Sequence, residues 1–430
     1  MKTLIKNCAI LPMDQEQQRI ANGYLVVEGK YIKELGQGTP PGGEYDKVID
    51  GTDQVLMPGL INTHTHAAMT LLRGFADDLP LMEWLETKIW PMEAKLTGDD
   101  IYWGTMLAIA EMLRSGTTCF ADMYFHMDRV AKAVEETGMR ASLCRGMIGV
   151  GPESEIAFSE SREVIETWHR QAGERLNFRL GPHAPYTCPP EYLKRVNQLA
   201  DELGVGIHIH LAETQDEVQT IEQMYGKTPT EYLLDCGVFE REVLAAHCVY
   251  VNEQDISSLL KHRVGIAHNP ESNMKLSSGV APVPQMLEAG LALGLGTDGA
   301  SSNNNLDLLQ EMRSSSFLHK LHTMNPTVLP AYQCMEMATI NGARALGLEQ
   351  EVGCLKPGMK ADMILINLNA PHMLPLYDLP ANLVYSAQAS DVDTVLIDGR
   401  VVMEKRKITS FDEEEVLRQV KACALRLVQG

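Results

Sequence analysis

The sequence predicts an α/β fold: a (β/α)8 TIM barrel over residues 58–354, and a small β-sandwich domain built from residues 1–57 and 355–430, with a C-terminal helix. Through the middle of the chain, short apolar segments alternate with amphipathic segments of helix length, which is typical of a parallel sheet. Both chain ends instead alternate apolar and polar residues around turn signals. Eight strand–helix units over about 300 residues match the size of a closed barrel.

The two chain ends are expected to share one β domain. Near the start, the apolar runs TLIKNCAILP and YLVVEGKYIKELG are bounded by turn residues, and Glu28-Gly29 divides the second run. Near the end, Asp398-Gly399 lies between the alternating runs VDTVLI and RVVMEK, which is a hairpin pattern. Both ends are therefore predicted to contribute antiparallel strands.

The barrel strands are expected to end in polar residues. Amphipathic segments at residues 99–116, 190–204 and 215–226 are predicted helices between strands. In such barrels the chemistry lies at the C-terminal ends of the strands, so the residues that close each strand are the candidates for function. The eight predicted strands are PGLINTHTH, GTTCFADM, RASLCRGMIG, FRLGPHAP, GVGIHIHLAE, EVLAAHCVYV, RVGIAHNPES and LALGLGTDGA.

Composition indicates a large globular chain that acts on a small molecule. The 430 residues are 45% hydrophobic and 22% charged, which excludes a disordered chain and a small disulfide scaffold. The net charge of −20 repels polyanions, so neither nucleic acid nor a membrane is an expected partner. Nine scattered cysteines without a Cys-x-x-Cys pair, and no export signal or membrane span, favour the cytoplasm. A homo-oligomer is expected only from how often such barrels assemble.

Four side chains on three predicted strands are candidate ligands of one metal ion. His64 and His66 lie two apart in a strand and point the same way, although such a pair alone is also common by chance. His210 closes the fifth strand, whereas His208 lies one layer deeper and is expected to be an interior residue or a support for a ligand. Asp298 closes the eighth strand, where a lone aspartate also fits a helix N-cap or a turn. Jointly, the four residues predict one metal site.

The donor set indicates the kind of ion and the class of reaction. Three neutral imidazoles and one carboxylate suit a divalent transition ion, with Zn²⁺ first and Fe²⁺ or Mn²⁺ as alternatives. One ion per subunit is expected, because Arg145 and His183 close the strands where two-metal barrels carry a bridging lysine. An ion with an open position activates water, so hydrolysis is the predicted reaction. Glu213 and His247 follow their strands beside this site.

These motifs resemble those of the amidohydrolase superfamily. PGLINTHTH, HIHLAE, AAHC and GLGTDGASSNNN stand in its order and spacing, and β segments flank the barrel as in its members. The resemblance covers nearly the whole chain. Within the superfamily, MTLLRGFADDLPLMEWLETKIWPME, HAPYTC and HNPESNMKLSSG resemble deaminases of 5′-methylthioadenosine and S-adenosylhomocysteine, and chlorotriazine and melamine hydrolases are close relatives.

The resemblance implies an aminohydrolase that converts adenine to hypoxanthine in a small-molecule nucleoside and releases ammonia. Replacing a ring amine requires hydroxide attack and proton transfers to a ring nitrogen and to the departing ammonia, and Glu213 and Asp298 are placed to carry these protons. His247 is implied to steady the attacking oxygen. The resemblance further implies the metal ligands His64, His66, His210 and Asp298 and the substrate contacts Glu93, Arg145, His183, Glu213 and Asp298.

Each implied substrate contact also has a plain structural interpretation. Glu93 would bind ribose hydroxyls, but alone it fits a solvated surface charge. Arg145 suits the carboxylate of a homocysteine tail, or else an ion pair with a loop acid. His183 would contact the purine, or else be held by backbone carbonyls. No role is assigned to Trp84 and Trp90, His268 is expected to orient a neighbour and not to bind metal, and His208 keeps the two interpretations given above.

Two other classes of protein are the alternatives. Guanine, cytosine and chlorotriazine or melamine aminohydrolases fit the same ligand set, and only Glu93 and Arg145 favour a nucleoside with an acidic tail. A non-catalytic scaffold is disfavoured because the full ligand set is present. A cytidine-deaminase type of zinc site is excluded because its paired cysteines are absent.

Overall fold

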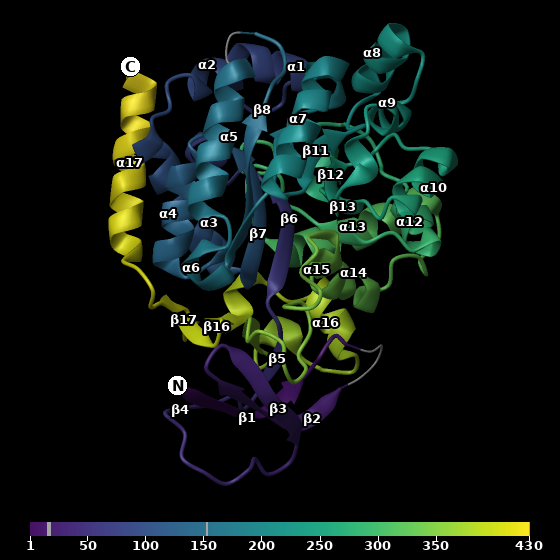
Figure 1. The fold of residues 1–430 in the computed structure, drawn as a ribbon. Coiled ribbons are helices and arrows are strands. Elements are labelled where there is room, and N and C mark those ends of the chain that lie inside the picture. Colours follow the sequence, from purple (N-terminus) through teal and green to yellow (C-terminus); the bar gives the residue numbers. More distant parts are fainter. Residues whose placement is uncertain (15–18, 152–153, 430) are drawn as a thin grey trace.

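The computed structural model describes residues 1–14, 19–151 and 154–429. In Figure 1 its strands form two regions. An end sheet lies at the bottom, built from purple N-terminal and yellow C-terminal segments, and a set of central parallel strands covered by helices lies above it. The largest cluster of buried apolar side chains joins the central strands to these helices.

The end sheet contains strands from both ends of the chain in one hydrogen-bonded sheet. Its strands are β1 (Lys2–Ile10), β2 (Ile20–Glu28), β3 (Tyr31–Gln37), β4 (Lys47–Asp50), β5 (Gln54–Pro58), β15 (Met363–Asn367), β16 (Val392–Ile397), β17 (Arg400–Glu404) and β18 (Lys407–Ile408). The two ends meet where β5 pairs antiparallel with β15. Both expected turns are present, with left-handed backbone at Gly29 and at Asp398-Gly399. These strands pair as a single sheet, which does not by itself show two packed layers. The β-sandwich therefore stays a prediction.

The central strands include all eight that the sequence predicts, the fourth as two short pieces. They are β6 (Leu60–Thr65), β7 (Thr117–Tyr124), β8 (Arg140–Met147), β9 (Leu176–Phe178), β10 (Gly181–Pro182), β11 (Ile207–Leu211), β12 (Val243–His247), β13 (Gly265–His268) and β14 (Leu293–Leu295). They form two parallel sheets, ordered β10-β8-β7-β6 with β9 beside β8, and β11-β12-β13-β14. The fold is of the TIM-barrel type, but the two sheets do not join into one closed ladder.

The two seams between these sheets carry isolated hydrogen bonds in place of a ladder. At one seam, Leu180 N donates to Gly206 O over 2.9 Å. At the other seam, Asp298 N donates to a carbonyl of β6, but the side chain of Asn62 bonds both the backbone N–H and the hydroxyl of Thr297. At this second seam the Asn62 side chain therefore occupies a backbone N–H that a closed ladder would pair.

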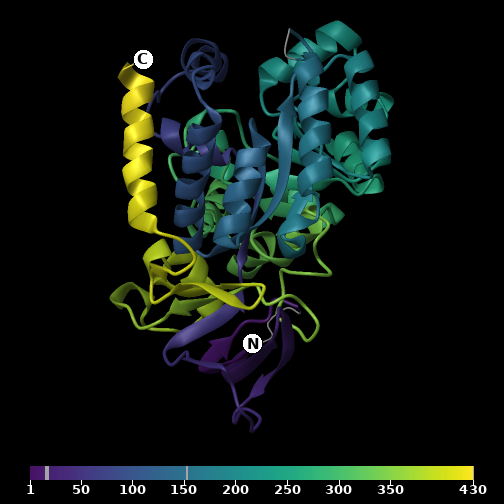
Figure 2. The same ribbon diagram turned by 60° about the vertical axis from the view of Figure 1, so that its left-hand side comes forward.

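Helices cover the outer face of the central strands, as the views in Figures 1 and 2 agree. The predicted helices are confirmed as α3, α7 and α8, and the sequence explains their ends: Thr97 and Thr214 cap the starts of α3 and α8, and Gly204 and Gly226 take left-handed backbone at the ends of α7 and α8. The helices are α1 (Leu81–Trp84), α2 (Trp90–Glu93), α3 (Gly98–Arg114), α4 (Met127–Thr137), α5 (Ser154–Trp168), α6 (Gln171–Glu174), α7 (Pro190–Leu203), α8 (Gln215–Tyr225), α9 (Pro229–Asp235), α10 (Glu253–Lys261), α11 (Pro270–Lys275), α12 (Val283–Ala289), α13 (Leu308–Thr323), α14 (Ala331–Met337), α15 (Ile340–Ala345), α16 (Leu379–Tyr385) and α17 (Glu413–Gln429).

The C-terminal helix α17 packs along α3 and not on the end sheet. Arg114 of α3 forms a two-fold ion pair with Glu413, at 2.5 and 2.6 Å, and Arg426 pairs with the buried Asp100. The division of the chain at residues 57/58 and 354/355 stays a prediction, with α17 in contact with the barrel region. Within the described part of the chain, no helix has the length and apolar character needed to cross a bilayer.

Candidate metal and active site

The four predicted metal ligands converge at the C-terminal ends of the central strands. His64 lies near the end of β6, His66 just after it, His210 in β11 and Asp298 in the turn after β14. Asp298 Oδ1 lies 3.4 Å from His64 Nε2 and 3.3 Å from His66 Nε2. The ring centroids of His64 and His210 are 4.9 Å apart. Residues more than 230 positions apart in the chain therefore face one point.

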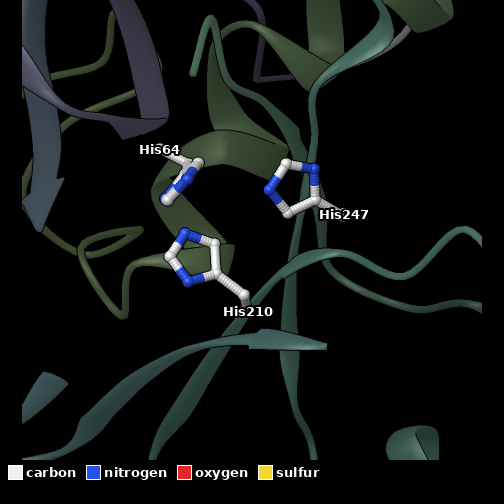
Figure 3. A group of neighbouring side chains, drawn as sticks. All are labelled: His64, His210 and His247. Carbon is white, nitrogen blue, oxygen red and sulfur yellow. The ribbon is translucent and has the colours of Figure 1, made fainter. Parts of the chain in front are cut away.

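His247, the last residue of β12, belongs to the same cluster. Ligand atoms of His64, His210 and His247 lie within 4.8 Å of one another, as do those of His64, His66 and Asp298. Figure 3 shows the three rings of the first group facing a common space. Because both groups contain His64, they surround one site. The sequence placed His247 beside the metal as a catalytic residue, and the geometry brings its ring within reach of an ion as well.

Backbone carbonyls set the orientation of two of these histidines. His66 Nδ1 donates to Met123 O over 2.6 Å, and His210 Nδ1 donates to His183 O over 2.8 Å. A carbonyl oxygen can only accept, so each ring carries its proton on Nδ1 and turns the lone pair of Nε2 inward. Such contacts raise the basicity of a metal-binding histidine and hold its plane.

Asp298 is held with one oxygen engaged and the other facing the histidines. Its Oδ2 accepts hydrogen bonds from Ser272, over 2.6 Å, and from Ser302, over 2.9 Å. Its Oδ1 is the atom that faces His64 and His66. The two hydroxyls therefore hold the carboxylate in place for monodentate binding to a cation.

The cluster fits a divalent metal ion. His64 Nε2 is buried, and no hydrogen bond satisfies it among the residues that the structure describes. A buried unsatisfied polar atom costs about 1–3 kcal/mol, and coordination would satisfy this nitrogen. Imidazole nitrogens with one carboxylate form a donor set typical of zinc and of neighbouring transition metals.

The chain turns sharply at the strand ends that carry this cluster. Ala212, His247 and Asp298 all have positive φ angles, of 49°, 72° and 57°. Left-handed backbone is unfavourable for residues with a Cβ, and such strain gathers at functional sites. At these three positions the strained turn aims the terminal side chains across the mouth of the barrel.

Glu213 lies beside the cluster, where the sequence predicted it. Its Oε2 is 3.8 Å from His247 Nε2. Burial raises the pKa of Glu213, and the negative charge of Asp298 acts in the same direction. A carboxyl group whose pKa is shifted toward neutrality can both take up and deliver protons.

A second carboxylate, Glu217, holds the backbone that carries Glu213. Glu217 is buried in the first turn of α8, and its two oxygens accept from Ala212 N (2.8 Å) and Glu213 N (2.9 Å). These amides belong to the strained turn after β11, so their partner fixes the direction in which Glu213 leaves the strand.

The cluster opens onto a cavity with aromatic and acidic walls. Trp84, Trp90 and Phe125 line this cavity, so both tryptophans that the sequence left unassigned face it. Glu93 also lines the cavity and accepts a hydrogen bond from the Tyr124 hydroxyl over 2.7 Å. Burial raises the pKa of Glu93. Glu93 is therefore not the solvated surface charge that it resembled in isolation.

His183 and Arg145 lie in different places. His183 lines the cavity, and its Nδ1 contacts the Thr187 hydroxyl at 3.1 Å. Arg145 lines a second hollow beside α4 and α5, where its Nε donates to Glu160 over 2.8 Å. The structure thus brings every predicted site residue except Arg145 to the cavity or the cluster; Arg145 instead forms an ion pair, as in its alternative interpretation, but with an acid of helix α5 and not of a loop.

Two further histidines take supporting positions. His208 Nε2 lies 2.9 Å from His64 Nδ1, on the side of that ring away from the cluster. His268 is buried against His319, with 3.2 Å between their Nε2 atoms. Sequence pattern did not identify Tyr124, Ser272, Ser302 or Glu217; for Glu217 the available signal was its place three residues after Thr214, the N-cap of α8.

The site is that of a metal-dependent hydrolase built on a barrel, and the chain belongs to the amidohydrolase family, whose sequence profile matches residues 55–402. It is 65% identical over 429 residues to the 5-methylthioadenosine/S-adenosylhomocysteine deaminase of Syntrophomonas wolfei, and the match covers 100% of both chains. It is 56% identical over 427 residues to the protein of the same name from Pelotomaculum thermopropionicum, covering 99% and 98% of the two chains.

Solved structures of similar fold extend this comparison. The chain resembles an adenosine deaminase from Xanthomonas campestris with bound zinc, at a TM-score of 0.94 and 33% identity, covering 100% of this chain and 99% of the other. It also resembles atrazine chlorohydrolase from Arthrobacter aurescens complexed with zinc, at a TM-score of 0.91 and 23% identity, covering 98% and 100%. The second likeness concerns the fold alone.

Proposed function

We propose that this chain catalyses the hydrolytic deamination of adenine nucleosides. Its substrates would be 5′-methylthioadenosine, S-adenosylhomocysteine and adenosine, and its products the inosine analogues and ammonia. The observation that carries the proposal is the convergence of the His64, His66, His210 and Asp298 side chains beside the largely buried Glu213, on one cavity. The names of full-length relatives at 65% and 56% identity support the same activity.

We propose Zn²⁺ as the resident ion, held by His64, His66, His210 and Asp298. The zinc in the solved Xanthomonas campestris relative supports this choice. When bound, a divalent ion lowers the pKa of water and supplies the hydroxide that hydrolysis requires. His247 Nε2, 3.8 Å from Glu213 Oε2, would donate a hydrogen bond to the attacking oxygen.

Glu213 would carry the proton that the ring needs. Attack at the carbon that bears the amine pushes electrons onto the neighbouring ring nitrogen, which must be protonated. Burial raises the pKa of Glu213 above its ordinary value, which favours the protonated carboxyl group that this step needs. Asp298, at the edge of the same site, would take the proton from the water and would pass that proton toward the departing ammonia.

Glu93 and His183 would select a purine nucleoside. The Tyr124 hydroxyl holds one oxygen of Glu93, so the carboxylate is positioned to accept from ribose hydroxyls. His183, which lines the same cavity, would contact the purine ring. Arg145 would bind the carboxylate of S-adenosylhomocysteine only after leaving Glu160, its partner in the structure.

A substrate panel tests the proposal. Purified zinc-loaded protein is assayed for ammonia release from 5′-methylthioadenosine, S-adenosylhomocysteine, adenosine, guanine, cytosine and a chlorotriazine. We expect turnover of the three adenine nucleosides and far slower turnover of the rest. Faster ammonia release from guanine, cytosine or the triazine would show that the proposed substrate class is wrong. Release from none of the compounds would contradict the proposal that the chain is an aminohydrolase. A cytoplasmic location and a homo-oligomer stay predictions.

A further inference from the structure

A line of hydrogen-bonding groups runs from His64 into the interior, away from the cavity. His64 Nδ1 lies 2.9 Å from His208 Nε2, and His208 Nδ1 lies 3.6 Å from Cys144 Sγ. Cys144 Sγ in turn lies 3.5 Å from the backbone carbonyl of Asp122. Cys144, His208 and His64 are all buried, so water does not compete for these contacts.

The Asp122 carbonyl at the inner end of this line determines where each proton lies. Asp122 O can only accept, so the single proton of the Cys144 thiol points to it. The sulfur must then accept from His208 Nδ1, which leaves Nε2 of a neutral His208 without a proton. His208 Nε2 therefore accepts from His64 Nδ1, and the lone pair of His64 lies on Nε2.

That nitrogen is the one that the metal site needs. His64 Nε2 faces Asp298 and is the buried atom whose hydrogen-bonding capacity is unmet in the described structure. For His66 and His210 a backbone carbonyl directly contacts Nδ1. For His64 the corresponding carbonyl, that of Asp122, acts through two intervening side chains.

We infer that Cys144 and His208 are positioning residues that hold His64 in its metal-binding tautomer. The inference rests on the metal site proposed above. Gly181 faces the thiol, and a Cβ added there would come to 2.9 Å from the sulfur, so the thiol can take this place only because residue 181 is a glycine. The thiol therefore acts here as a hydrogen-bond acceptor in a fixed place, although free buried cysteines usually serve only to fill space.

Two pairs of variants test this line of hydrogen bonds: in each pair one substitution removes an acceptor atom and the other keeps one. Cys144→Ala removes the sulfur that accepts from His208, whereas Cys144→Ser keeps a donor and an acceptor. His208→Leu removes the contact with His64, whereas His208→Gln keeps an amide oxygen that can accept from His64 Nδ1. Cys334→Ala is the matched control, since Cys334 is also buried and its thiol also contacts a backbone carbonyl, that of Leu329 at 3.7 Å.

The measured quantity is the zinc dissociation constant of the full chain, obtained by competition with a chromogenic chelator. The unfolding midpoint of the metal-free protein is recorded for each variant. Loss of a group that supports a metal ligand typically weakens metal affinity by about 10–100-fold. We expect losses in this range for Cys144→Ala and His208→Leu, smaller losses for Cys144→Ser and His208→Gln, and no loss for Cys334→Ala.

Several results would overturn the inference. Wild-type affinity in Cys144→Ala would do so, as would equal losses in Cys144→Ala and Cys144→Ser, because the acceptor would then be irrelevant. A loss of affinity that follows the unfolding midpoint across all variants, the control included, would indicate a purely structural effect. If the wild-type chain itself binds no zinc, the proposed metal site fails, and the inference fails with it.

Discussion

Removal of the Glu217 carboxylate should impair catalysis without touching the metal ligands. Glu217 is 4% exposed, and it is the hydrogen-bond partner of two backbone amides in the strained turn that precedes α8. In Glu217→Ala both amides lose their acceptor inside the protein. The turn, which includes the left-handed Ala212, then has no side chain to hold its direction.

The structure bounds the size of the effect. Each buried donor left unpaired costs about 1–3 kcal/mol, so two amides place roughly 2–6 kcal/mol on this turn. Part of that cost lowers the free energy of unfolding, and the rest is relieved as the turn shifts and carries Glu213 with it. A shift of about 1 Å in a catalytic group can cost about 100-fold in rate. We therefore expect kcat to fall about 100-fold, with zinc content unchanged.

Steady-state kinetics with 5′-methylthioadenosine, measured together with zinc stoichiometry, checks this prediction. Glu217→Gln keeps one acceptor oxygen and should fall between wild type and Glu217→Ala. Asp216→Ala, an exposed change on the same helix, is the control and should leave kcat unchanged. A Glu217→Ala protein with normal kcat would refute the positioning argument. One that loses its zinc would show that Glu217 supports the metal site and not Glu213.

Three further predictions concern the proton carrier, the acidic tail and a partly buried helix cap. Glu213→Gln should retain zinc but lose about 100- to 10,000-fold in kcat, because the group that protonates the ring is gone; a near-normal rate would remove Glu213 from that role. Arg145→Ala should reduce kcat/KM for S-adenosylhomocysteine more than for 5′-methylthioadenosine, and equal reductions would leave Arg145 only its ion pair with Glu160. Burial raises the pKa of Asp307, which caps α13, to about 6. The folded chain then binds more protons than the unfolded chain between about pH 4 and 6, so this contribution to stability is present at low pH and is lost as the pH rises through 6. Asp307→Asn keeps the cap, and relative to wild type its free energy of unfolding should rise by about 3 kcal/mol from pH 4 to 7 in urea titrations; a constant difference would contradict the shift.

Local pattern was sufficient for the elements and for the core of the site. The His64 and His66 pair, His210 at the end of an apolar run and Asp298 in a glycine-rich strand end are all visible within a few residues of sequence. The alternation of strand and helix then places strand ends together, because parallel strands present their carboxyl ends at the same edge. The hairpin at Asp398-Gly399 is also confirmed, because a two-residue turn depends only on its own backbone.

Side-chain partners from distant segments were beyond the reach of sequence pattern. Nothing near Arg145 in the sequence indicates that its guanidinium pairs with Glu160 of α5, away from the cavity. Likewise, the bond from Ser272 to Asp298 and the Tyr124 hydroxyl on Glu93 join residues that only packing brings together. The seam between β6 and the segment after β14 belongs here too, because the Asn62 side chain bonds Thr297 there.

The amino-acid sequence alone was enough to identify which chemical groups this protein brings to a reaction and at which strand ends they stand, because strand periodicity and spacing are local properties. The folded chain settled which oxygen of Asp298 is left facing the histidines, which residues hold Glu213, and where Arg145 points. These features depend on distances of a few ångströms between particular side chains and backbone groups, and such distances arise only when helices and strands pack at specific angles and the side chains between them settle into one set of rotamers.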